Sequence, residues 1–574
     1  MAENKEFMIT ALLWFASARR RAVLFSLLLL GFTSEFLSGV IIPEDRRVDW
    51  APGIPGGIPT NYPVFCNVRE KIPGSPLLAV GDGKADDTAA LAAAIHWCPP
   101  RQVVYVPAGT YRISWTLRLS DSIVLRGAGQ GKTRFLLDSP NRQSVVRIGS
   151  GEHVSKEVRI ESGFGKNSTK LTFADPWSVR SFREGDFIAV TQDNDPVLVF
   201  PNGMTWGGMK GSRQLMTQIV PVSGKSENSL LLGRPLYFTF HQELNPVAYR
   251  LSGLTADAGL ESCTLETLHN AGAANSIDMI GSVHCWVRDV EVYHSPKSFV
   301  WIVYSFGNEI RECYVHEPWD SEGGSGYGFH IFGPNSDHLI EDNIAWQCRH
   351  SMVMEGGGSG CVFGYNCSAD AWSTVSPGWV YNDLITHGAH PYMNLYEGNS
   401  LHKWSQDYVH GSSSHCTGFR NQITGGGEPT AHRYTIAYWP VSFESRNYFM
   451  NVVGNVLGWP GATTRYEFVS PGNCVYKIGY GGEGDTVLQD PYSARTALRH
   501  GNYDFANKSV VWDSAVRDHA IPDSLYLKKK PAFFGNQAWP WVGPDLDPMV
   551  KAFPARVRFE AIQKARSPKA VLAE

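Results

Sequence analysis

Side chains able to move protons are concentrated in the middle of this 574-residue chain. Twelve of its 18 histidines fall between His284 and His432. Imidazole titrates near neutral pH, so it can accept or release a proton during a reaction. Six residues of this region are candidate catalytic residues: His387, His410, Glu355, His330, Tyr408 and Glu444. No HExxH spacing accompanies them, so the sequence predicts no metal site here.

The histidines belong to units that repeat along the chain. The last residues of successive units are 22 to 34 residues apart: Asp289, Glu312, Asn343, Asn366, Asn399, Asn421 and Asn455. A period in this range is typical of a solenoid coil. Because Asn tolerates the left-handed backbone of a tight turn, we expect the asparagines to stack at one corner. The sequence therefore predicts a β-solenoid whose coils hold the candidate residues.

Strand alternation decides which side chains point outward from each coil. When the units are aligned on the repeat, His330 follows Phe299 in one outward row, and Phe332 follows Trp301 in the next. Successive coils of a parallel sheet stack about 4.8 Å apart, so each row is a line of neighbouring side chains.

Glu355, His387 and His410 would lie on three consecutive coils, roughly 5 Å apart. His387 takes this place only if a one-residue slip puts it outward instead of Gly388. Glu444 would lie three coils from Glu355, roughly 14 Å away. A single histidine is more often a hydrogen-bonded structural residue, and that alternative stays open for each of them.

Three coils carry insertions of roughly ten residues, and stacked coils place these insertions above one another to form one wall of a cleft. Aromatic and charged residues there make candidate substrate-binding residues: Asp320, Tyr327, Trp301, Arg349, His390, Trp404, Arg420 and Arg446. Guanidinium groups hold a carboxylate bidentately, so Arg349, Arg420, Arg433 and Arg446 are candidates for binding a uronate.

The segment GDGKADDTAALAAAI at residues 81–95 is followed by VVYVPAGTY at residues 103–111. Together they resemble the amino-terminal cap of the pectate-lyase-like superfamily of right-handed parallel β-helices. The resemblance implies an all-β, right-handed parallel β-helix whose open end is covered by a capping helix. Asp86, Asp87 or Thr88 can cap that helix, since side-chain oxygens accept its free N–H groups.

The resemblance also implies chemistry at glycosidic bonds of polysaccharides, by lyases, hydrolases and some epimerases. A lyase needs a base that removes the proton at C5 of a uronate, and an arginine or a calcium ion that neutralises the carboxylate. Calcium is therefore left open as a cofactor. A hydrolase needs two carboxylates about 5–10 Å apart. Glu355 and Glu444 are too far apart for this, and Asp320, Asp383 or Asp407 could close the gap.

Motifs of known catalytic families are absent: NTD and GHG of polygalacturonases, WIDH and RxPxxR of pectate lyases, and DPHE of alginate-type epimerases. The histidines and tyrosines favour a lyase acting on a uronate-containing polysaccharide. A glycoside hydrolase, or a non-catalytic carbohydrate-binding or adhesin-like surface protein, are the alternatives.

With a net charge of −4, the chain lacks the excess of basic residues from which a nucleic-acid binder forms its basic face. The chain is expected to act as a monomer on a polysaccharide, with no membrane contact beyond an amino-terminal anchor. Arg19 to Arg21 precede the apolar run AVLFSLLLLGFT, which is typical of a secretory signal, with a retained anchor as the alternative. We therefore expect a secreted, periplasmic or cell-surface protein.

Four parts of the chain are expected. They are a signal or anchor at 1–40, a Pro/Gly-rich lead at 41–75, the β-helix at 76–530 with a β insertion at 155–255, and a carboxyl-terminal cap or tail at 531–574 that covers the end of the solenoid. Ten cysteines include no CxxC pair. Cys66 with Cys98, or Cys361 with Cys367, could form disulfides, and free buried cysteines are equally compatible with the sequence.

Overall fold

The computed structural model describes residues 41–151, 153–201, 213–272, 274–429, 434–470 and 472–566. The chain divides into two compact units. The first, Met1–Ile41 with Ser514–Ala520, contributes only Ile41 and residues 514–520 to the described part. The second, Ile42–Asp513 with Ile521–Glu574, contains the solenoid. The signal or anchor expected at residues 1–40 lies outside the described residues. No described helix is both long and apolar enough to cross a membrane.

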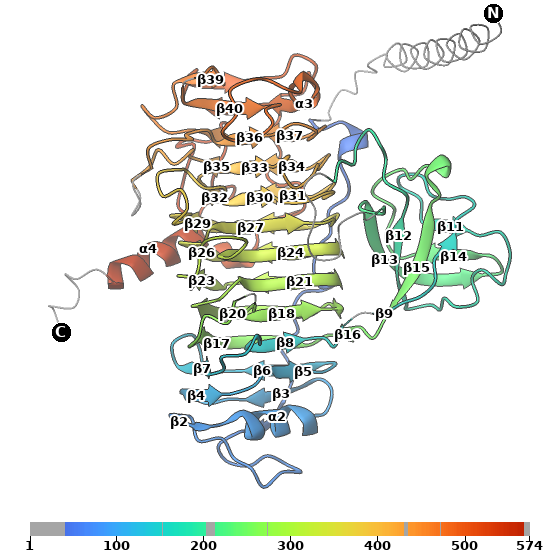
Figure 1. Ribbon diagram of the computed structural model, residues 1–574, viewed down its shortest axis with the longest axis vertical. Coiled ribbons are helices and arrows are strands. Elements are labelled where there is room, and N and C mark those ends of the chain that lie inside the picture. The colour runs from blue at the N-terminus through green and yellow to red at the C-terminus, as the bar shows by residue number, and fades with distance from the viewer. Residues whose placement is uncertain are drawn as a thin grey trace, which may run out of the picture. The chain divides into compact units, whose positions relative to one another are not determined.

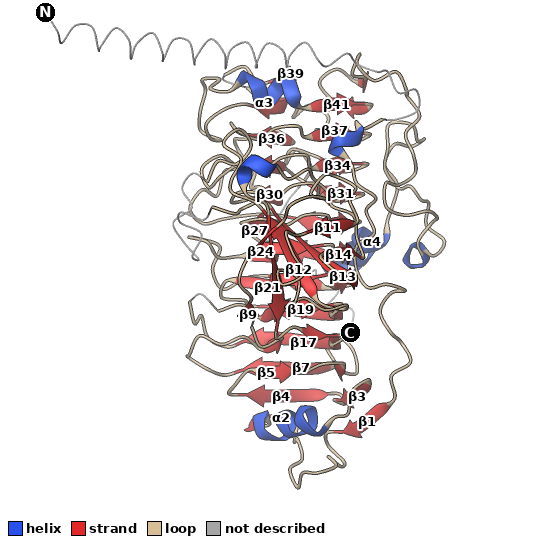
Figure 2. Ribbon diagram, turned by 90° about the vertical axis from the view of Figure 1, so that its right-hand side faces the viewer, coloured by secondary structure: helices blue, strands red, loops and turns tan. Residues whose placement is uncertain are grey.

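The second unit is a right-handed parallel β-helix, as expected, with three columns of parallel strands (Figures 1 and 2). The first column consists of β5 (Leu117–Leu119), β8 (Val146–Ile148), β18 (Ile277–Ile280), β21 (Ser298–Phe306), β24 (Tyr327–Ser336), β27 (His350–Glu355), β30 (Leu384–Thr386), β33 (Trp404–Gln406), β36 (Val441–Phe443), β40 (Cys474–Ile478) and β39 (Arg465–Glu467). The short strands β16 (Thr255–Ala256) and β19 (Ser282–Val283) pair at its margin.

Every complete coil continues from the first column into the other two. The second column consists of β1 (Val64–Asn67), β3 (Gln102–Tyr105), β6 (Ile123–Arg126), β17 (Gly259–Thr267), β20 (Trp286–Tyr293), β22 (Glu309–Arg311), β25 (Leu339–Glu341), β28 (Val362–Gly364), β31 (Leu395–Glu397), β34 (Thr417–Phe419), β37 (Asn451–Val453) and β41 (Leu498–His500).

The third column consists of β2 (Asp82–Asp86), β4 (Gly109–Ile113), β7 (Thr133–Leu137), the carboxyl halves of β17 and β20, β23 (Tyr314–His316), β26 (Ile344–Trp346), β29 (Cys367–Ala369), β32 (Ser400–Leu401), β35 (Gln422–Ile423), β38 (Val456–Leu457) and β42 (Asn502–Asp504). Apolar side chains from all three columns fill the interior, where burial of apolar surface stabilises the stack. All ten cysteines are buried and free, so neither possible disulfide forms and the alternative of free buried cysteines holds.

Helix α2 (Thr88–Trp97) covers the first coil with four buried residues: Ala90, Leu91, Ala94 and Ile95. The Thr88 N–H donates to Asp86 Oδ1 at 3.0 Å, so Asp86 supplies a capping oxygen. Asp87 occupies the N-cap position without a side-chain cap bond. Its carboxylate instead accepts the N–H groups of Val80 and Gly81, which fixes the turn before the helix.

The predicted asparagine stack exists, but its physical reason differs from the expected one. The N–H of each of Asn343, Asn366, Asn399 and Asn421 donates to the side-chain oxygen of the asparagine one coil further on, at 2.9–3.1 Å. The left-handed backbone belongs to the residue before each asparagine, such as Gly398 with φ 68°. These asparagines therefore act through their amides, which replace backbone partners at the corner.

An antiparallel sheet interrupts the solenoid between β8 and β16, over the region of the expected insertion. It consists of β9 (His153–Val154), β10 (Val158–Arg159), β11 (Lys170–Thr172), β12 (Phe187–Thr191), β13 (Thr217–Ser226), β14 (Ser229–Leu232) and β15 (Val247–Ser252), and it includes the short helix η2 (Gln242–Leu244). It has its own apolar core and contacts the solenoid where the Ile219 N–H donates to Ser336 Oγ at 2.9 Å.

The lead runs along the coils, with η1 (Glu44–Arg46) near its start. Trp50 Nε1 donates to the Met393 carbonyl at 2.9 Å, and the Ile54 N–H donates to Glu309 Oε1 at 2.8 Å. These bonds fasten the lead to two separate coils, so it is a strap along the solenoid.

The carboxyl-terminal tail does not cover the end of the solenoid, contrary to expectation. Its η3 (Ala532–Phe534) and α4 (Pro554–Arg566) pack on the side of the middle coils. Arg558 Nη1 bonds to Asp342 Oδ2 at 2.8 Å and Trp541 Nε1 donates to the Gly398 carbonyl at 2.7 Å. The last coil is instead protected by the antiparallel strand β43 (Ser509–Val511) on β42, with α3 (Pro491–Thr496) before β41. The tail packs on the side because it buries aromatic residues of the third column there.

Candidate functional site

One outward row of the first column carries most of the titratable candidates. Phe332 pairs with Glu355, and the pairing of Met354 with Thr386 places His387 beside Glu355. In the next two coils Asp407 and Glu444 follow the paired residues Gln406 and Phe443. The row therefore reads Phe332, Glu355, His387, Asp407 and Glu444.

This order corrects the sequence alignment in two places. His330 pairs with Trp301 and not with Phe299, so it belongs to the neighbouring row. Asp407 takes the place expected for His410, which lies in the loop after β33 because that strand ends at Gln406. The one-residue slip that favours His387 over Gly388 is present.

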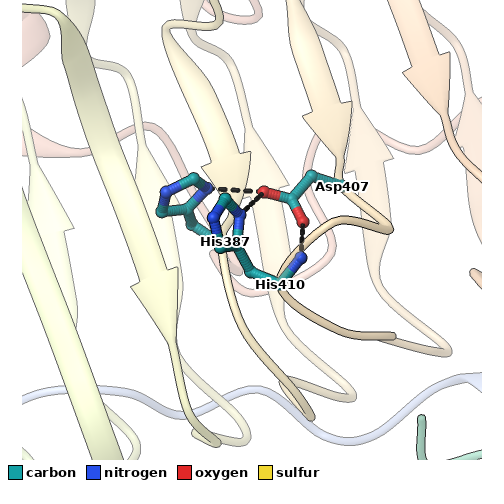
Figure 3. Close-up of side chains that lie close together, drawn as sticks. All are labelled: His387, Asp407 and His410. Atoms are coloured by element: carbon teal, nitrogen blue, oxygen red, sulfur yellow. Dashed lines mark hydrogen bonds and ion pairs between the residues drawn. The ribbon is translucent and has the colours of Figure 1, made fainter. Parts of the chain in front are cut away.

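Asp407 joins the two histidines into one cluster (Figure 3). Its Oδ2 lies 2.5 Å from His387 Nδ1 and 2.7 Å from His410 Nδ1, and its Oδ1 accepts the His410 N–H at 2.9 Å. The imidazole centroids are 3.9 Å apart. Asp407 accepts a hydrogen bond from each Nδ1, which fixes the orientation of both rings. Nε2 is then the nitrogen of each ring that can exchange a proton.

The charges of this cluster shift its pKa values. Burial alone would raise the pKa of Asp407, but His387 and His410 overcome it and hold that pKa well below its usual range. Burial alone would lower the pKa of His387, but Asp407, and secondarily Glu355, raise it. Burial and the nearby Asp407 charge raise the pKa of Glu444 well above its usual range. His387 is thus a stronger base than a free imidazole, while Glu444 keeps its proton.

A second set of hydrogen-bonded side chains connects β24 to this row. His330 Nε2 lies 3.0 Å from Glu355 Oε2, and His330 Nδ1 lies 3.0 Å from Ser298 Oγ. Burial lowers the pKa of His330 even though Glu355 counteracts it. Neutral His330 therefore fixes the Glu355 carboxylate in place.

A cavity of about 820 Å³ opens over this row. Its lining consists of Lys297, Trp301, Gly323, Gly324, Ser325, Tyr327, Phe332, Arg349, Glu355, His387 and His410. The loop between β23 and β24 supplies the glycines and Ser325, which matches the expected cleft wall at one of the three insertions. Trp301 and Phe332 stand side by side with centroids 5.8 Å apart and present apolar ring surface.

Arg349 gives the cavity an unusual feature. Its Nε and Nη1 atoms are buried, and no group in the described part of the chain bonds to them. Buried N–H groups without partners are rare in folded proteins and are destabilising. Together with Lys297 they make the cavity suited to an anionic group.

Three of the candidate residues serve the fold instead of the cavity. Trp404 is fully buried in the solenoid core against Phe443, because β33 begins with an inward position. His390 is buried between Ser412 and Ser414, and burial lowers its pKa to about 3. These residues cannot contact a substrate as expected.

Arg420 is also engaged elsewhere, whereas Asp320 lies in the loop between β23 and β24. Arg420 forms a bidentate pair with Asp545 of the tail, at 2.8 Å for both bonds, so it anchors the tail and not a uronate. Asp320 accepts the Glu322 N–H at 2.8 Å within its loop.

The remaining candidates lie at the edge of the site. The Tyr408 N–H donates to Glu444 Oε2 at 2.6 Å, and the Tyr408 ring stacks on Phe200 at 5.4 Å. The exposed Arg446 guanidinium lies 5.2 Å from the same Phe200 ring. The cavity lining formed by described residues includes none of Tyr408, Glu444 and Arg446. Arg433 lies outside the described residues.

Sequence reasoning missed the central place of Asp407 and left out Lys297. Asp407 stands three residues before His410, a spacing that could have indicated a local carboxylate–imidazole pair. Asp383, weighed as a hydrolytic carboxylate, is buried and accepts the N–H groups of His402 and Lys403 at 2.7 and 2.9 Å. It is a structural residue.

The same cluster has the ligand types of a transition-metal site. One ligand atom each from His387, Asp407 and His410 lie within 4.8 Å of one another. Both imidazoles bond through Nδ1 to a single carboxylate oxygen, and these hydrogen bonds account for the close approach without an ion.

Comparison with known proteins agrees with the amino-terminal cap. Residues 77–168 match the family model of rhamnogalacturonase A/epimerase, pectate lyase-like. Mannuronan C5-epimerases AlgE3 and AlgE4 of Azotobacter vinelandii are 39% and 38% identical over 89 residues, and the matches cover 13% of this chain. The match spans only 5% and 16% of the length of those curated relatives.

One of the similar solved structures is that of a phage tailspike protein. The tailspike protein gp49 from Pseudomonas phage LKA1 is 16% identical, with a TM-score of 0.49, over 69% of this chain and 66% of that chain.

The three strand columns and the capping helix define a parallel β-helix protein with a charged cavity on its first column. The family match at residues 77–168 covers the amino-terminal cap and the first coils of this solenoid, where the chain is similar to pectate-lyase-like proteins.

Proposed function

We propose that this protein is a polysaccharide lyase that cleaves a uronate-containing glycan by β-elimination. The observation that supports this most is the Arg349 guanidinium, whose buried Nε and Nη1 have no partner among the described residues and which lines the same cavity as His387. A carboxylate bound there would accept a charge-assisted hydrogen bond from one of these N–H groups.

The chemistry follows from the residues of the cavity. Arg349 and Lys297 bind the carboxylate and stabilise the charge that develops when the C5 proton leaves. His387 Nε2 takes this proton, the C5–H electron pair forms the C4–C5 double bond, and the bond from C4 to the glycosidic oxygen breaks. Tyr327, whose pKa is raised by burial, stays protonated and donates its proton to the leaving oxygen. Asp407 orients His387 and raises its basicity.

The comparisons support a substrate of this kind. Two similar proteins are named mannuronan C5-epimerases, and the matching family model is described as rhamnogalacturonase A/epimerase. These names concern sugar polymers, and the similarity covers the cap rather than the cavity. An extracytoplasmic location is part of the same proposal, because Arg19 to Arg21 and the apolar run that follows them are typical of a secretory signal.

A glycoside hydrolase is the second candidate. Glu355 and Asp407 lie on either side of His387 in one row. They are two coils, or roughly 10 Å, apart, which is near the upper limit of the distance between the two carboxylates of an inverting hydrolase. Asp407, however, already accepts bonds from both imidazoles and from the His410 backbone. This leaves it poorly placed to activate a water molecule, so the hydrolase ranks below the lyase.

The test is a panel of acidic and neutral polysaccharides, followed for ultraviolet absorbance of unsaturated uronate ends and for new reducing ends. A lyase gives both signals in parallel with an acidic polymer, and His387→Gln abolishes them. New reducing ends without absorbance would establish a hydrolase and reject elimination. Binding without either signal would favour the adhesin-like alternative.

A further inference from the structure

A second cavity lies on a different part of the solenoid. It measures about 530 Å³ and is formed at the corner between the second and third columns. The loop at residues 129–132 closes one side, and the tail closes another through Phe533, Arg558 and Ile562. None of its lining residues belongs to the first column, so it is separate from the candidate catalytic cavity.

Three acidic residues line this corner on successive coils. Arg288, Arg311 and Glu341 are paired in register, so the residues that follow them, Asp289, Glu312 and Asp342, are equivalent. Asp342 is the innermost of the three. Arg558 Nη1 holds its Oδ2 at 2.8 Å, which fixes the direction of the other oxygen.

Two of the residues that line this cavity each have a buried polar atom without a partner in the described part of the chain: Asp342 Oδ1 and Tyr314 Oη. The two residues are only 2% and 3% exposed. Burial raises the pKa of Tyr314, which keeps its phenol protonated and able to donate. The cavity thus offers one fixed acceptor and one hydroxyl that can donate or accept.

The rest of the lining limits what can satisfy these atoms. Ile344, Phe533 and Ile562 contribute apolar surface, which suits a flat ring with C–H faces. The three carboxylates outnumber the two cations of the lining, Lys132 and Arg558, which disfavours an anion. A metal ion is disfavoured too, because among the described residues the only three-ligand group of metal-binding spacing is the His387 cluster. A ligand with hydroxyl groups on an uncharged ring fits best, and the cavity volume suits one or two sugar rings.

We propose that this cavity is a non-catalytic binding site for a neutral sugar unit. Its hydroxyl groups bond to Asp342 Oδ1 and Tyr314 Oη while the ring packs on Phe533 and Ile562. The proposal does not depend on the reaction at His387, and it distinguishes the two cavities by charge. The first suits an acidic sugar because of Arg349 and Lys297, and the second suits a sugar without a carboxylate.

The test measures binding of neutral, amino and acidic di- and trisaccharides to the full chain by saturation-transfer NMR and calorimetry. Tyr314→Phe removes an atom that bonds to no described group, so folding is expected to be unaffected and binding of the neutral sugar to weaken about tenfold. Ile562→Trp fills the cavity from its half-buried edge and is expected to abolish binding. Tyr327→Phe, in the first cavity, is the matched control and should leave binding unchanged.

The outcomes separate the proposal from its alternatives. Neutral-sugar binding that both Tyr314→Phe and Ile562→Trp reduce supports it, whether or not the protein cleaves any polymer. The proposal is overturned if no neutral sugar binds, or if only Tyr327→Phe weakens the binding. It is also overturned if the protein prefers uronates or amino sugars and Ile562→Trp abolishes their binding.

Discussion

The imidazole rings of His387 and His410 lie 3.9 Å apart, and both bond through Nδ1 to one oxygen of Asp407. The two histidines come from different loops of consecutive coils, so their proximity depends on the stacking of the solenoid. Asp407 carries the negative charge that keeps two proton-exchanging rings together. The proposed catalytic base therefore depends on a residue outside the cavity lining.

Asp407→Asn is expected to lower kcat by roughly 10²–10³-fold, because the amide no longer favours the required orientation and charge of His387. Asp407 raises the pKa of His387, so removing its charge lowers that pKa and makes the basic form available at lower pH. The rising limb of the pH–kcat profile should shift toward acid. An unchanged limb with reduced kcat would assign Asp407 a purely structural role.

Arg349→Met is expected to raise KM for an acidic polymer at least tenfold with little change in the midpoint of urea unfolding. The reason is that Nε and Nη1 give up no protein hydrogen bonds in the described part of the chain. Arg311→Met is the control, since Arg311 pairs with Glu309 and Glu341 and its loss leaves buried carboxylates unpaired. Arg311→Met should destabilise the fold. A large loss of stability in Arg349→Met would contradict this account.

Trp404 and Trp301 should respond in opposite ways to truncation. Trp404→Ala removes a fully buried ring from the solenoid core and is expected to lower the free energy of unfolding by about 3–5 kcal/mol. Trp301→Ala, at the half-buried cavity surface, should change it by about 1 kcal/mol or less but weaken substrate binding. Urea unfolding and KM measurements on both variants check the pair, and equal stability losses would argue against this placement.

Asn399→Ala is expected to reduce stability by about 2–4 kcal/mol. Its side chain accepts the Asn366 N–H at 3.0 Å and donates to the Phe363 carbonyl at 2.9 Å, so alanine leaves both buried backbone groups unsatisfied. Asn399→Asp keeps the acceptor and should show whether the donor contributes. A loss below about 1 kcal/mol for Asn399→Ala would mean that the corner relaxes around the missing amide.

The buried pair of His402 and Asp383 predicts a pH dependence of stability. Burial alone would lower the pKa of His402, but Asp383 and Glu428 raise it to about 9. The unfolded value is near 6.5, so the stabilisation is fully present below that pH and is lost as pH rises through 9. The full contribution of this pKa shift to the free energy of unfolding is about 3 kcal/mol. Urea unfolding from pH 6 to 10 measures it, and His402→Gln should remove the slope while lowering overall stability.

The amino-terminal cap and the coil period could be predicted from the sequence alone. Both are set by local chemistry: glycine turns with helix-forming residues at 81–95, and asparagines that recur once per coil. His387, Glu355 and Arg349 could be recognised as candidates because their side chains are able to exchange protons or bind anions. These features depend on residue type and spacing, which the sequence shows directly.

Only the tertiary structure decided which of these residues meet. A shift of one residue in a strand turns every side chain to the other face, and unequal loop lengths hide that register in the sequence. The end of β33 at Gln406 placed Asp407, not His410, in the outward row, while its start at Trp404 turned that ring into the core. The tail likewise packed on the side of the coils because Arg420 and Asp342 bind it there, contacts between residues more than 100 positions apart.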